Sequence, residues 1–294
     1  MSSGVVAFKE GSILTILAAI LPHCVYCGCV SFSFSIFIVT ALIAGLLLGS
    51  FLNVCIVRLP AHASIVAPPS HCQACGAPIR SWDNVPILSW LLLRGRCRDC
   101  GARISIQYPL VELGTASLFV ACVLHSGAAW QTIIDAAACF LLLGLAVMDA
   151  QTMLLPDTFT LTGVLLALML KIFAPGVSHR GVVAWKTFED AVIAAAMLLL
   201  VWFLYRVVRH RDGVGMGDVK LLAMIAAFLG LPLALFAYFI AVLCAAIFAI
   251  VLVARRKARG QDRIAFGSFL AAAGILAIFA GRPVLAWYLG LFHR

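Results

Sequence analysis

Charged residues are scarce in this sequence. Only 11% of its 294 residues are Asp, Glu, Lys or Arg, whereas 64% are hydrophobic. A soluble domain of this length cannot bury so much apolar surface, so the composition excludes an ordinary soluble globular protein. We predict instead an all-α, polytopic membrane protein.

Eight apolar runs could cross a bilayer core of about 30 Å, for which a helix needs about 20 residues. The runs cover residues 32–57, 109–126, 130–148, 154–174, 187–208, 217–230, 231–254 and 265–290. The sixth run is short, and Gly230-Leu-Pro232 predicts a turn between it and the seventh. The sequence therefore predicts about eight transmembrane helices.

Residues 1–31 form an apolar extension whose role stays open. A ninth span, a re-entrant segment and an uncleaved signal-like segment are all compatible with it, because it is apolar but contains Pro22, His23 and three cysteines. The extension lacks a convincing cleavage site of small residues, which argues against its removal.

Basic residues orient the predicted helices. Most of the 21 Lys and Arg residues lie in three gaps between spans: after the first, between the fifth and sixth, and between the seventh and eighth. Eight alternating spans put these three gaps on one side of the membrane, and the positive-inside rule makes that side the cytoplasm. Topology thereby explains the net charge of +9 without a nucleic-acid partner.

Two Cys-x-x-Cys pairs lie in the first of these basic loops, residues 58–108. They are Cys72 with Cys75 and Cys97 with Cys100, and a glycine follows each pair directly. Four thiolates at such spacing can surround one Zn²⁺ tetrahedrally. Two disulfides or unpaired thiols are the alternatives, which a reducing cytoplasm disfavours. This small, Pro-rich loop cannot bury much core, so metal binding would supply most of its folding free energy.

Acidic residues are rarer still, with 12 Asp and Glu in the chain. Those within or against the apolar runs are functional candidates, because an ionisable group at membrane depth is costly. They are Glu112, Asp135, Asp149, Asp157, Glu189, Asp190 and Asp218. A helix-start role accounts for Glu189 and Asp190. Structural roles are also open to Asp135, as an interhelical hydrogen-bonding group, and to Glu112, as the partner of a loop arginine.

Asp149 and Asp218 both fall at the predicted cytoplasmic membrane boundary. Two carboxylates that meet in a semi-dry cleft share one proton, because like charges so close resist joint ionisation. The charged acid then acts as a general base on water, and the protonated acid donates to the substrate carbonyl. The glycines of Gly215-Met-Gly217-Asp218 would let an extended peptide approach the backbone.

The Gly-x-Gly-Asp pattern is a weak signal when it stands alone. A glycine-rich turn in which Asp218 caps a helix is an equally good interpretation of those four residues. Asp157, which follows Leu154-Leu155-Pro156, is a competing acid, although capping the fourth span is the better interpretation of it.

Taken in order, the motifs resemble those of the bacterial type IV prepilin leader peptidases, which are bifunctional membrane aspartyl proteases and N-methyltransferases. The resemblance begins at Gly49-Ser-Phe-Leu-Asn-Val-Cys-Ile-Val-Arg-Leu-Pro60 and continues through the paired Cys-x-x-Cys loop. It then includes Ile104–Leu113, Asp149 with Leu155-Pro-Asp157, Gly215–Leu221 and Phe266–Leu270. So many ordered motifs, over about residues 32–290, make chance agreement improbable.

The resemblance implies specific site residues. It places the family's catalytic pair on Asp149 and Asp218. It places the metal tetrad, which would hold one structural zinc ion, on Cys72, Cys75, Cys97 and Cys100. Four thiolates leave no open position on the metal for a catalytic water.

The resemblance also implies the reaction. A short basic leader would be cut at the cytoplasmic face of the bacterial inner membrane, after a glycine and before the hydrophobic helix of a type IV prepilin or type II secretion pseudopilin. The new N-terminal amine would then be methylated with S-adenosylmethionine. No Rossmann-type glycine fingerprint locates the methyl donor, which the resemblance places near the zinc loop. A peptidase without methyltransferase activity is the alternative.

The implied organisation has four parts. They are the apolar extension 1–31, a first main transmembrane helix over 32–57, the cytoplasmic zinc loop over 58–108, and a helical membrane peptidase core over 109–294. The expected partners are the pilin substrates and membrane lipid, with no nucleic acid. An ion-coupled transporter would show an inverted repeat, which is not evident here. A membrane thiol–disulfide oxidoreductase would need exposed Cys-x-x-Cys pairs at the oxidising face.

Overall fold

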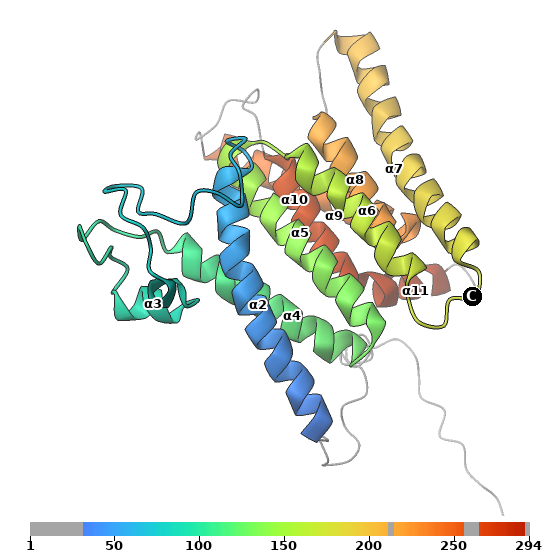
Figure 1. Cartoon of the computed structure of the whole chain (residues 1–294). Coiled ribbons are helices and arrows are strands. Elements are labelled where there is room, and N and C mark those ends of the chain that lie inside the picture. Colours follow the sequence, from blue (N-terminus) through green and yellow to red (C-terminus); the bar gives the residue numbers. More distant parts are fainter. Residues whose placement is uncertain (1–31, 211–214, 256–264, 292–294) are drawn as a thin grey trace, which may run out of the picture.

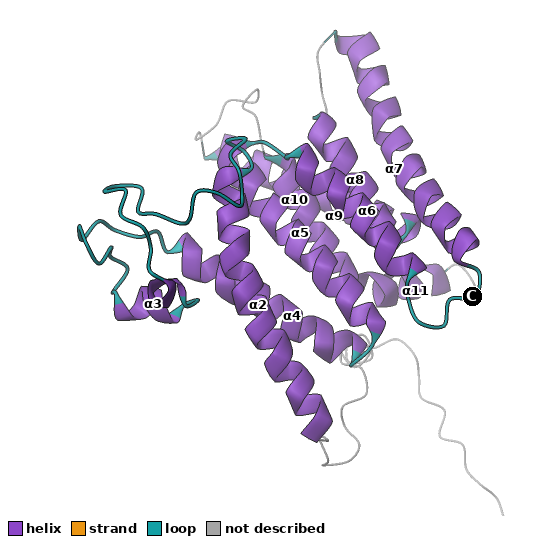
Figure 2. Cartoon of the chain, viewed as in Figure 1, coloured by secondary structure: helices purple, strands orange, loops and turns teal. Residues whose placement is uncertain are grey.

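The computed structural model describes residues 32–210, 215–255 and 265–291, and the extension 1–31 lies outside them. Nearly all regular structure in the described residues is helical, and they contain no strand (Figure 2). Two isolated β-bridges occur in the loop between the first two long helices. The predicted all-α fold is therefore confirmed.

A helix occupies each of the eight predicted runs. The helices are α2 (Phe32–Arg58), α4 (Gln107–Ser126), α5 (Trp130–Thr152), α6 (Asp157–Ile172), α7 (Arg180–Arg209), α8 (Met216–Leu229), α9 (Leu231–Ala254), and α10 (Phe266–Leu276) continued by η2 (Ala277–Gly281) and α11 (Arg282–Gly290). Six of these segments are long and apolar enough to cross a membrane. The other two, α6 and α8, have 16 and 14 residues. At 1.5 Å per residue they measure only about 24 and 21 Å.

Helices α2 and α4 pack with unusually close backbones (Figure 1). A Cβ atom on Gly45 would lie 2.5 Å from the Cα of Ala116, and one on Gly49 would lie 2.7 Å from the Cα of Glu112. Small residues at a helix–helix contact allow such an approach, which drives association where lipid supplies no hydrophobic force. Gly49 thereby sets the position of Glu112 against α2.

Helix α10 lies among α5, α8 and α9 and contacts all three (Figure 1). Helix α8 also packs against α6 and α7. The side chains of Leu221, Leu222 and Ile225 on α8 are fully buried, although this helix is the shortest of the eight. Helix α8 is therefore a central, protein-enclosed element, and its packing brings its first turn near the end of α5 and the start of α10.

The loop between α2 and α4 is the longest connection between two long helices in the described residues. It contains the short helices η1 (Ser81–Asn84) and α3 (Leu88–Leu92) and both Cys-x-x-Cys pairs. It lies beside α2 and α4, on the opposite side of the bundle from α7 (Figure 1). The division of the chain into four parts stays a prediction.

Candidate active site and metal centre

Asp149 lies in the last turn of α5, and its side chain is almost completely buried, with 5% of the residue exposed. The carboxylate oxygen Oδ2 accepts hydrogen bonds from the backbone N–H of Ser268 at 2.6 Å and from its hydroxyl at 3.0 Å. Ser268 belongs to the first turn of α10. The start of α10 therefore holds one oxygen of Asp149 in a fixed position.

Asp218 is the third residue of α8 and is half-buried. Its backbone N–H donates to the carbonyl of Gly215 at 3.1 Å, which closes the tight turn before the helix. Its carboxylate is close enough to Asp149 for the two charges to interact, and Tyr238 of α9 lies close to it as well. The structure thus brings together the two acids that the sequence analysis singled out.

Leu155 packs between the backbones beside the two acids. A Cβ atom on Gly217 would lie 2.9 Å from the Leu155 Cβ, and one on Gly267 would lie 2.9 Å from its Cδ1. The same Cβ on Gly267 would come within 3.0 Å of both Cγ and Oδ2 of Asp149. Both glycines are therefore required sterically, because any larger residue would displace Leu155 or the Asp149 carboxylate.

Asp157, the competing acid, is exposed and is paired elsewhere. It is the first residue of α6, and 60% of its side chain is exposed. Its Oδ1 lies 2.6 Å from Nζ of Lys220, two residues beyond Asp218 on α8. Asp157 begins α6 but does not cap it, because Pro156 occupies the N-cap position and no side-chain cap hydrogen bond is present, so the expected capping role is wrong. The ion pair ties the beginning of α6 to that of α8.

Two expectations for the other membrane-embedded acids are wrong. Glu189 and Asp190 do not start a helix, because α7 begins earlier, at Arg180. Both follow Lys186 on the same helix, and the Lys186 Nζ lies 3.1 Å from Oδ1 of Asp190. Glu112 has no arginine partner among the described residues: its Oε2 accepts the backbone N–H of Ile87 at 2.7 Å. Lys186 and Asp190 have the (i, i+4) spacing of helical ion pairs, a signal that the apolar-run criterion overlooked.

Both carboxylate oxygens of Asp135, at the opposite end of α5, accept a hydrogen bond. Its Oδ2 accepts the hydroxyl of Ser126 at 2.7 Å, and its Oδ1 accepts the amide of Gln131 at 2.8 Å. The Ser126 bond joins α4 to α5, so the expected interhelical role is confirmed.

The two Cys-x-x-Cys pairs form matching turns. In the first, Gly76 N–H donates to the Cys72 carbonyl at 2.9 Å; in the second, Gly101 N–H donates to the Cys97 carbonyl at 3.0 Å. Both glycines have φ near +70°, at +72° and +71°, which glycine adopts without strain. Each turn is closed by one antiparallel bridge. The sequence predicted these turns correctly because their geometry is local.

The four Sγ atoms converge. All lie within 4.8 Å of one another, and those of Cys72 and Cys100 are 3.9 Å apart. Zinc–sulfur bonds of about 2.3 Å in a tetrahedron separate the sulfurs by about 3.8 Å. Backbone N–H groups, first that of Cys75 and then that of Ala74, lower the pKa of the Cys72 thiol to about 6. The thiolate is the form that binds metal. The pKa of the Cys100 thiol is instead raised to about 12, so the spacing of the four sulfurs, rather than their pKa values, indicates that the cluster could hold one metal ion.

An ion pair fixes the second turn to η1. Arg98, next to Cys97, donates from Nε to Oδ2 of Asp83 at 2.9 Å and from a terminal nitrogen to Oδ1 at 2.5 Å. Hydrogen bonding from Arg98 lowers the pKa of the Asp83 carboxyl. This two-point contact restricts the loop around the cysteine cluster.

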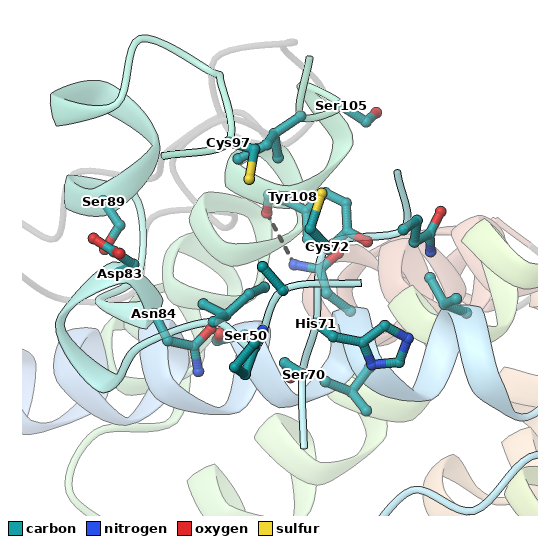
Figure 3. Close-up of a pocket in the computed structure, with 18 of the residues that line it drawn as sticks. Ser50, Ser70, His71, Cys72, Asp83, Asn84, Ser89, Cys97, Ser105 and Tyr108 are labelled. Carbon is teal, nitrogen blue, oxygen red and sulfur yellow. Dashed lines mark hydrogen bonds between the residues drawn. The ribbon is translucent and has the colours of Figure 1, made fainter. Parts of the chain in front are cut away.

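A cavity of about 610 Å³ lies between the loop, α2 and the start of α4. Figure 3 shows Ser50 from α2, Tyr108 from α4, and His71 and Asp83 from the loop around this space. Asn53 and Glu112 also line it. Sequence reasoning missed Asn53, although an asparagine within an apolar run was a detectable signal.

Comparison with known proteins places the chain among related sequences. Residues 43–126 match the family model described as the bacterial peptidase A24 N-terminal domain, and residues 136–250 match that of the type IV leader peptidase family. The comparison with solved structures gave no match.

Three curated relatives carry the description "Prepilin leader peptidase/N-methyltransferase". That of Pseudomonas putida is 35% identical over 85% of this chain and 93% of its own length. That of Aeromonas hydrophila is 36% identical over 84% and 92%. That of Burkholderia pseudomallei (strain 1026b) is 32% identical over 83% and 85%. The resemblance seen in the motifs is thus confirmed over most of the sequence, and this chain belongs to the type IV leader peptidase family.

Proposed function

We propose that this chain removes the leader peptide of type IV prepilins and type II secretion pseudopilins and then methylates the new N-terminus. The relatives described as bifunctional enzymes support both activities. The observation that carries the peptidase activity is the meeting of Asp149 and Asp218, from two helices far apart in the sequence.

Asp149 and Asp218 share one proton and act as a general acid–base pair. The ionised carboxylate takes a proton from a water molecule, whose oxygen attacks the scissile carbonyl carbon, while the protonated carboxyl gives its proton to the carbonyl oxygen. The tetrahedral intermediate then collapses: the carbon–nitrogen bond breaks, and the leaving amine receives a proton from the acid formed in the first step. The other carboxylate takes the proton from one hydroxyl of the intermediate as the new carbonyl forms, which restores the shared proton. Ser268 orients Asp149 throughout.

The active site faces the cytoplasm in a multi-pass inner-membrane protein. The concentration of basic residues in the loops at this end of the helices supports that orientation. A prepilin, whose leader is basic and whose following segment is a hydrophobic helix, could then present its cleavage site at the membrane boundary.

The four cysteines bind one structural zinc ion. Bound zinc would fold the loop, because all four of its coordination positions are filled by thiolates. Their mutual distances and the tight turns that present them support this assignment. The loop then forms one wall of the cavity beside α2 and α4.

S-adenosylmethionine is the methyl donor. The cavity has a size within the range of about 300–1,000 Å³ that is typical for small-molecule sites. It contains a buried amide oxygen, that of Asn53, for which no described residue supplies a donor. The volume of the cavity and its unpaired acceptor are therefore compatible with a polar ligand of the size of S-adenosylmethionine.

Cleavage of a purified prepilin in detergent tests the acid pair, with product masses measured by mass spectrometry. Asp149→Asn and Asp218→Asn should each lower the cleavage rate by at least about 100-fold, the scale of general acid–base catalysis. Asp157→Asn is the matched control and should cleave normally, because Asp157 is exposed and paired with Lys220.

Wild-type rates in either Asp149→Asn or Asp218→Asn would refute the assignment of the pair and make Asp157 the next candidate. The product mass of the wild-type reaction also tests the second activity, since methylation adds one CH₂ unit. A product that never gains this mass would favour a peptidase without methyltransferase activity.

A further inference from the structure

The helical wall of the cavity beside the cysteine cluster contains polar side chains that can accept hydrogen bonds. Asn53 and Ser50 come from α2 and Glu112 from α4, whereas the opposite wall belongs to the loop. Asn53 and Glu112 are both deeply buried, with 2% and 7% of each residue exposed. Two such polar residues on facing membrane helices need partners, because an unpaired buried group is costly.

Asn53 is only half satisfied. Its amide nitrogen donates to the carbonyl of Tyr108 at 3.0 Å, which fixes the orientation of the side chain. Its Oδ1 is buried, and no described residue donates to it. An orphaned acceptor of this kind costs about 1–3 kcal/mol unless a ligand or water supplies a donor. The missing partner must therefore carry an N–H or O–H group.

Glu112 adds a charge to the same wall. The backbone N–H of Ile87 occupies one of its oxygens, and the hydroxyl of Ser50 is a further neighbour. A carboxylate can accept about four hydrogen bonds, so capacity remains for another donor. A buried carboxylate is most strongly stabilised by a cation. Arg58, Arg98 and Arg103 also line the cavity, but Arg58 donates to the backbone carbonyls of Ser64 and Pro68, and Arg98 donates to Asp83.

The helical wall of the cavity is also linked to the end of α5, the helix that carries Asp149. The amide of Gln151, two residues after Asp149, donates to the side chain of Gln107 at 2.7 Å. Gln107 precedes Tyr108, whose carbonyl receives the Asn53 bond. These two hydrogen bonds thus connect the end of α5 to this wall.

We propose that Asn53 and Glu112 bind a primary amine in this cavity, to which the proposed function assigns methyl transfer. The inference rests on the proposed methyltransferase activity. Two amines fit the chemistry: the new N-terminus of the cleaved pilin, and the amino group in the methionine portion of the methyl donor.

If the bound amine is the pilin N-terminus, Glu112 also takes part in proton transfer. The ammonium group loses one proton to the Glu112 carboxylate, and the free nitrogen lone pair attacks the methyl carbon of the donor. A carbon–nitrogen bond forms while the carbon–sulfur bond breaks, and the electron pair of that bond stays on sulfur. The methylated amine is charged on formation, and the Glu112 proton passes to water.

The test uses full-length wild-type protein, Asn53→Leu and Glu112→Gln, purified in detergent. Glu112→Gln keeps an oxygen for the Ile87 N–H and removes only the charge. Three quantities are measured: the rate of prepilin cleavage, the rate and KM of methylation with a precleaved pilin peptide, and the affinity for S-adenosylhomocysteine by calorimetry. Asp135→Asn is the matched control, a buried membrane carboxylate lost at the far end of α5.

Both variants should methylate at least about tenfold more slowly than wild type, since each loses a hydrogen bond to a charged partner. Cleavage should persist in both, and Asp135→Asn should keep both activities. Weaker binding of S-adenosylhomocysteine would identify the donor's amino group as the bound amine. Unchanged binding with a raised KM for the peptide would identify the pilin N-terminus.

Wild-type methylation in both variants would overturn the inference. A parallel loss of cleavage and methylation would also overturn it, because the two residues would then support the fold rather than the cavity. A wild-type protein that cleaves but never methylates would overturn the methyltransferase half of the proposed function and this inference together.

Discussion

The acid pair and the cysteine cluster lie in the same chain but are assembled by different means. Asp149 and Asp218 come from α5 and α8 and meet only because α10, α8 and α6 pack around them. The four cysteines come from one loop, in two local turns that a bound metal would join. The comparison teaches that the peptidase site should tolerate changes in the loop, whereas the cavity built partly by the loop should not.

Loss of a metal ligand should produce the largest difference between the effects on methylation and on cleavage. Replacing Cys72 or Cys97 with Ser would remove one of the four proposed ligands and destabilise the loop, because a bound metal would supply most of its folding free energy. Methylation should fall to background in each variant and cleavage should fall no further than methylation, both measured on one prepilin substrate. Zinc content, measured by atomic absorption, should fall in parallel. Full activity of both kinds in a variant with all four cysteines replaced by Ser would contradict the structural-zinc assignment.

Gly267→Ala should damage the other site. The new Cβ would lie 3.0 Å from the Asp149 carboxylate carbon and 2.9 Å from Leu155, so the carboxylate must move. Because a catalytic group must keep its position relative to the substrate, this displacement of the Asp149 carboxylate should slow cleavage by about 100-fold. Methylation of a precleaved peptide should be nearly unchanged, which is the readout that separates the two sites. Gly114→Ala on α4, where the nearest atom is 3.6 Å away, is the control and should cleave normally.

Ser268→Ala should have a smaller effect on the same carboxylate. The hydroxyl bond to Asp149 is lost, but the backbone N–H of residue 268 still donates to it. Loss of one hydrogen bond of ordinary strength predicts cleavage about 2- to 13-fold slower. Kinetics with a prepilin peptide measure this directly, and Ser268→Thr, which retains a hydroxyl, should restore part of the rate. A loss as large as that of Asp149→Asn would show that Ser268 has a further role.

Asp83→Asn should produce the smallest change, confined to the loop. Pairing with Arg98 lowers the pKa of Asp83 in the folded state, so the pair stabilises the loop above the unfolded carboxyl pKa of about 3.9. That contribution is lost as the pH falls through the lower, folded-state pKa. Zinc retention under mild denaturation should therefore be slightly weaker in Asp83→Asn than in wild type at pH 7, and the difference should vanish in strong acid. An equal difference at every pH would contradict the pairing.

The sequence predicted the helices well where the pattern is continuous. Pro156 and Gly230 mark helix boundaries that the structure confirms. The predicted start of this span at residue 187 was wrong because Arg180 and Lys186 interrupt the apolar run, although Lys186 is accommodated by its ion pair with Asp190 along α7. The short lengths of α6 and α8 were equally hidden, because hydropathy does not reveal whether a segment is enclosed by protein or by lipid.

The candidate sites also contain features that the sequence could predict and features that it could not. The cysteine turns could be predicted because each is completed within a few residues, as the bonds from Gly76 and Gly101 show. The roles of Asp149 and Asp218 in catalysis stay predictions, supported by their proximity. The partner of Glu112 could not be predicted, since Ile87 reaches it through the path of a loop with no regular period.

By itself the sequence determined the membrane class, the approximate helices, the metal-binding turns and the family, because each depends on composition or on residues near one another in the chain. The tertiary structure alone decided which acids meet, that Asp157 is paired with Lys220, and that Asn53 and Glu112 face one cavity. These relations join residues on different helices. They depend on close packing at Gly49, Gly217 and Gly267, and no local pattern encodes how helices far apart in the sequence dock.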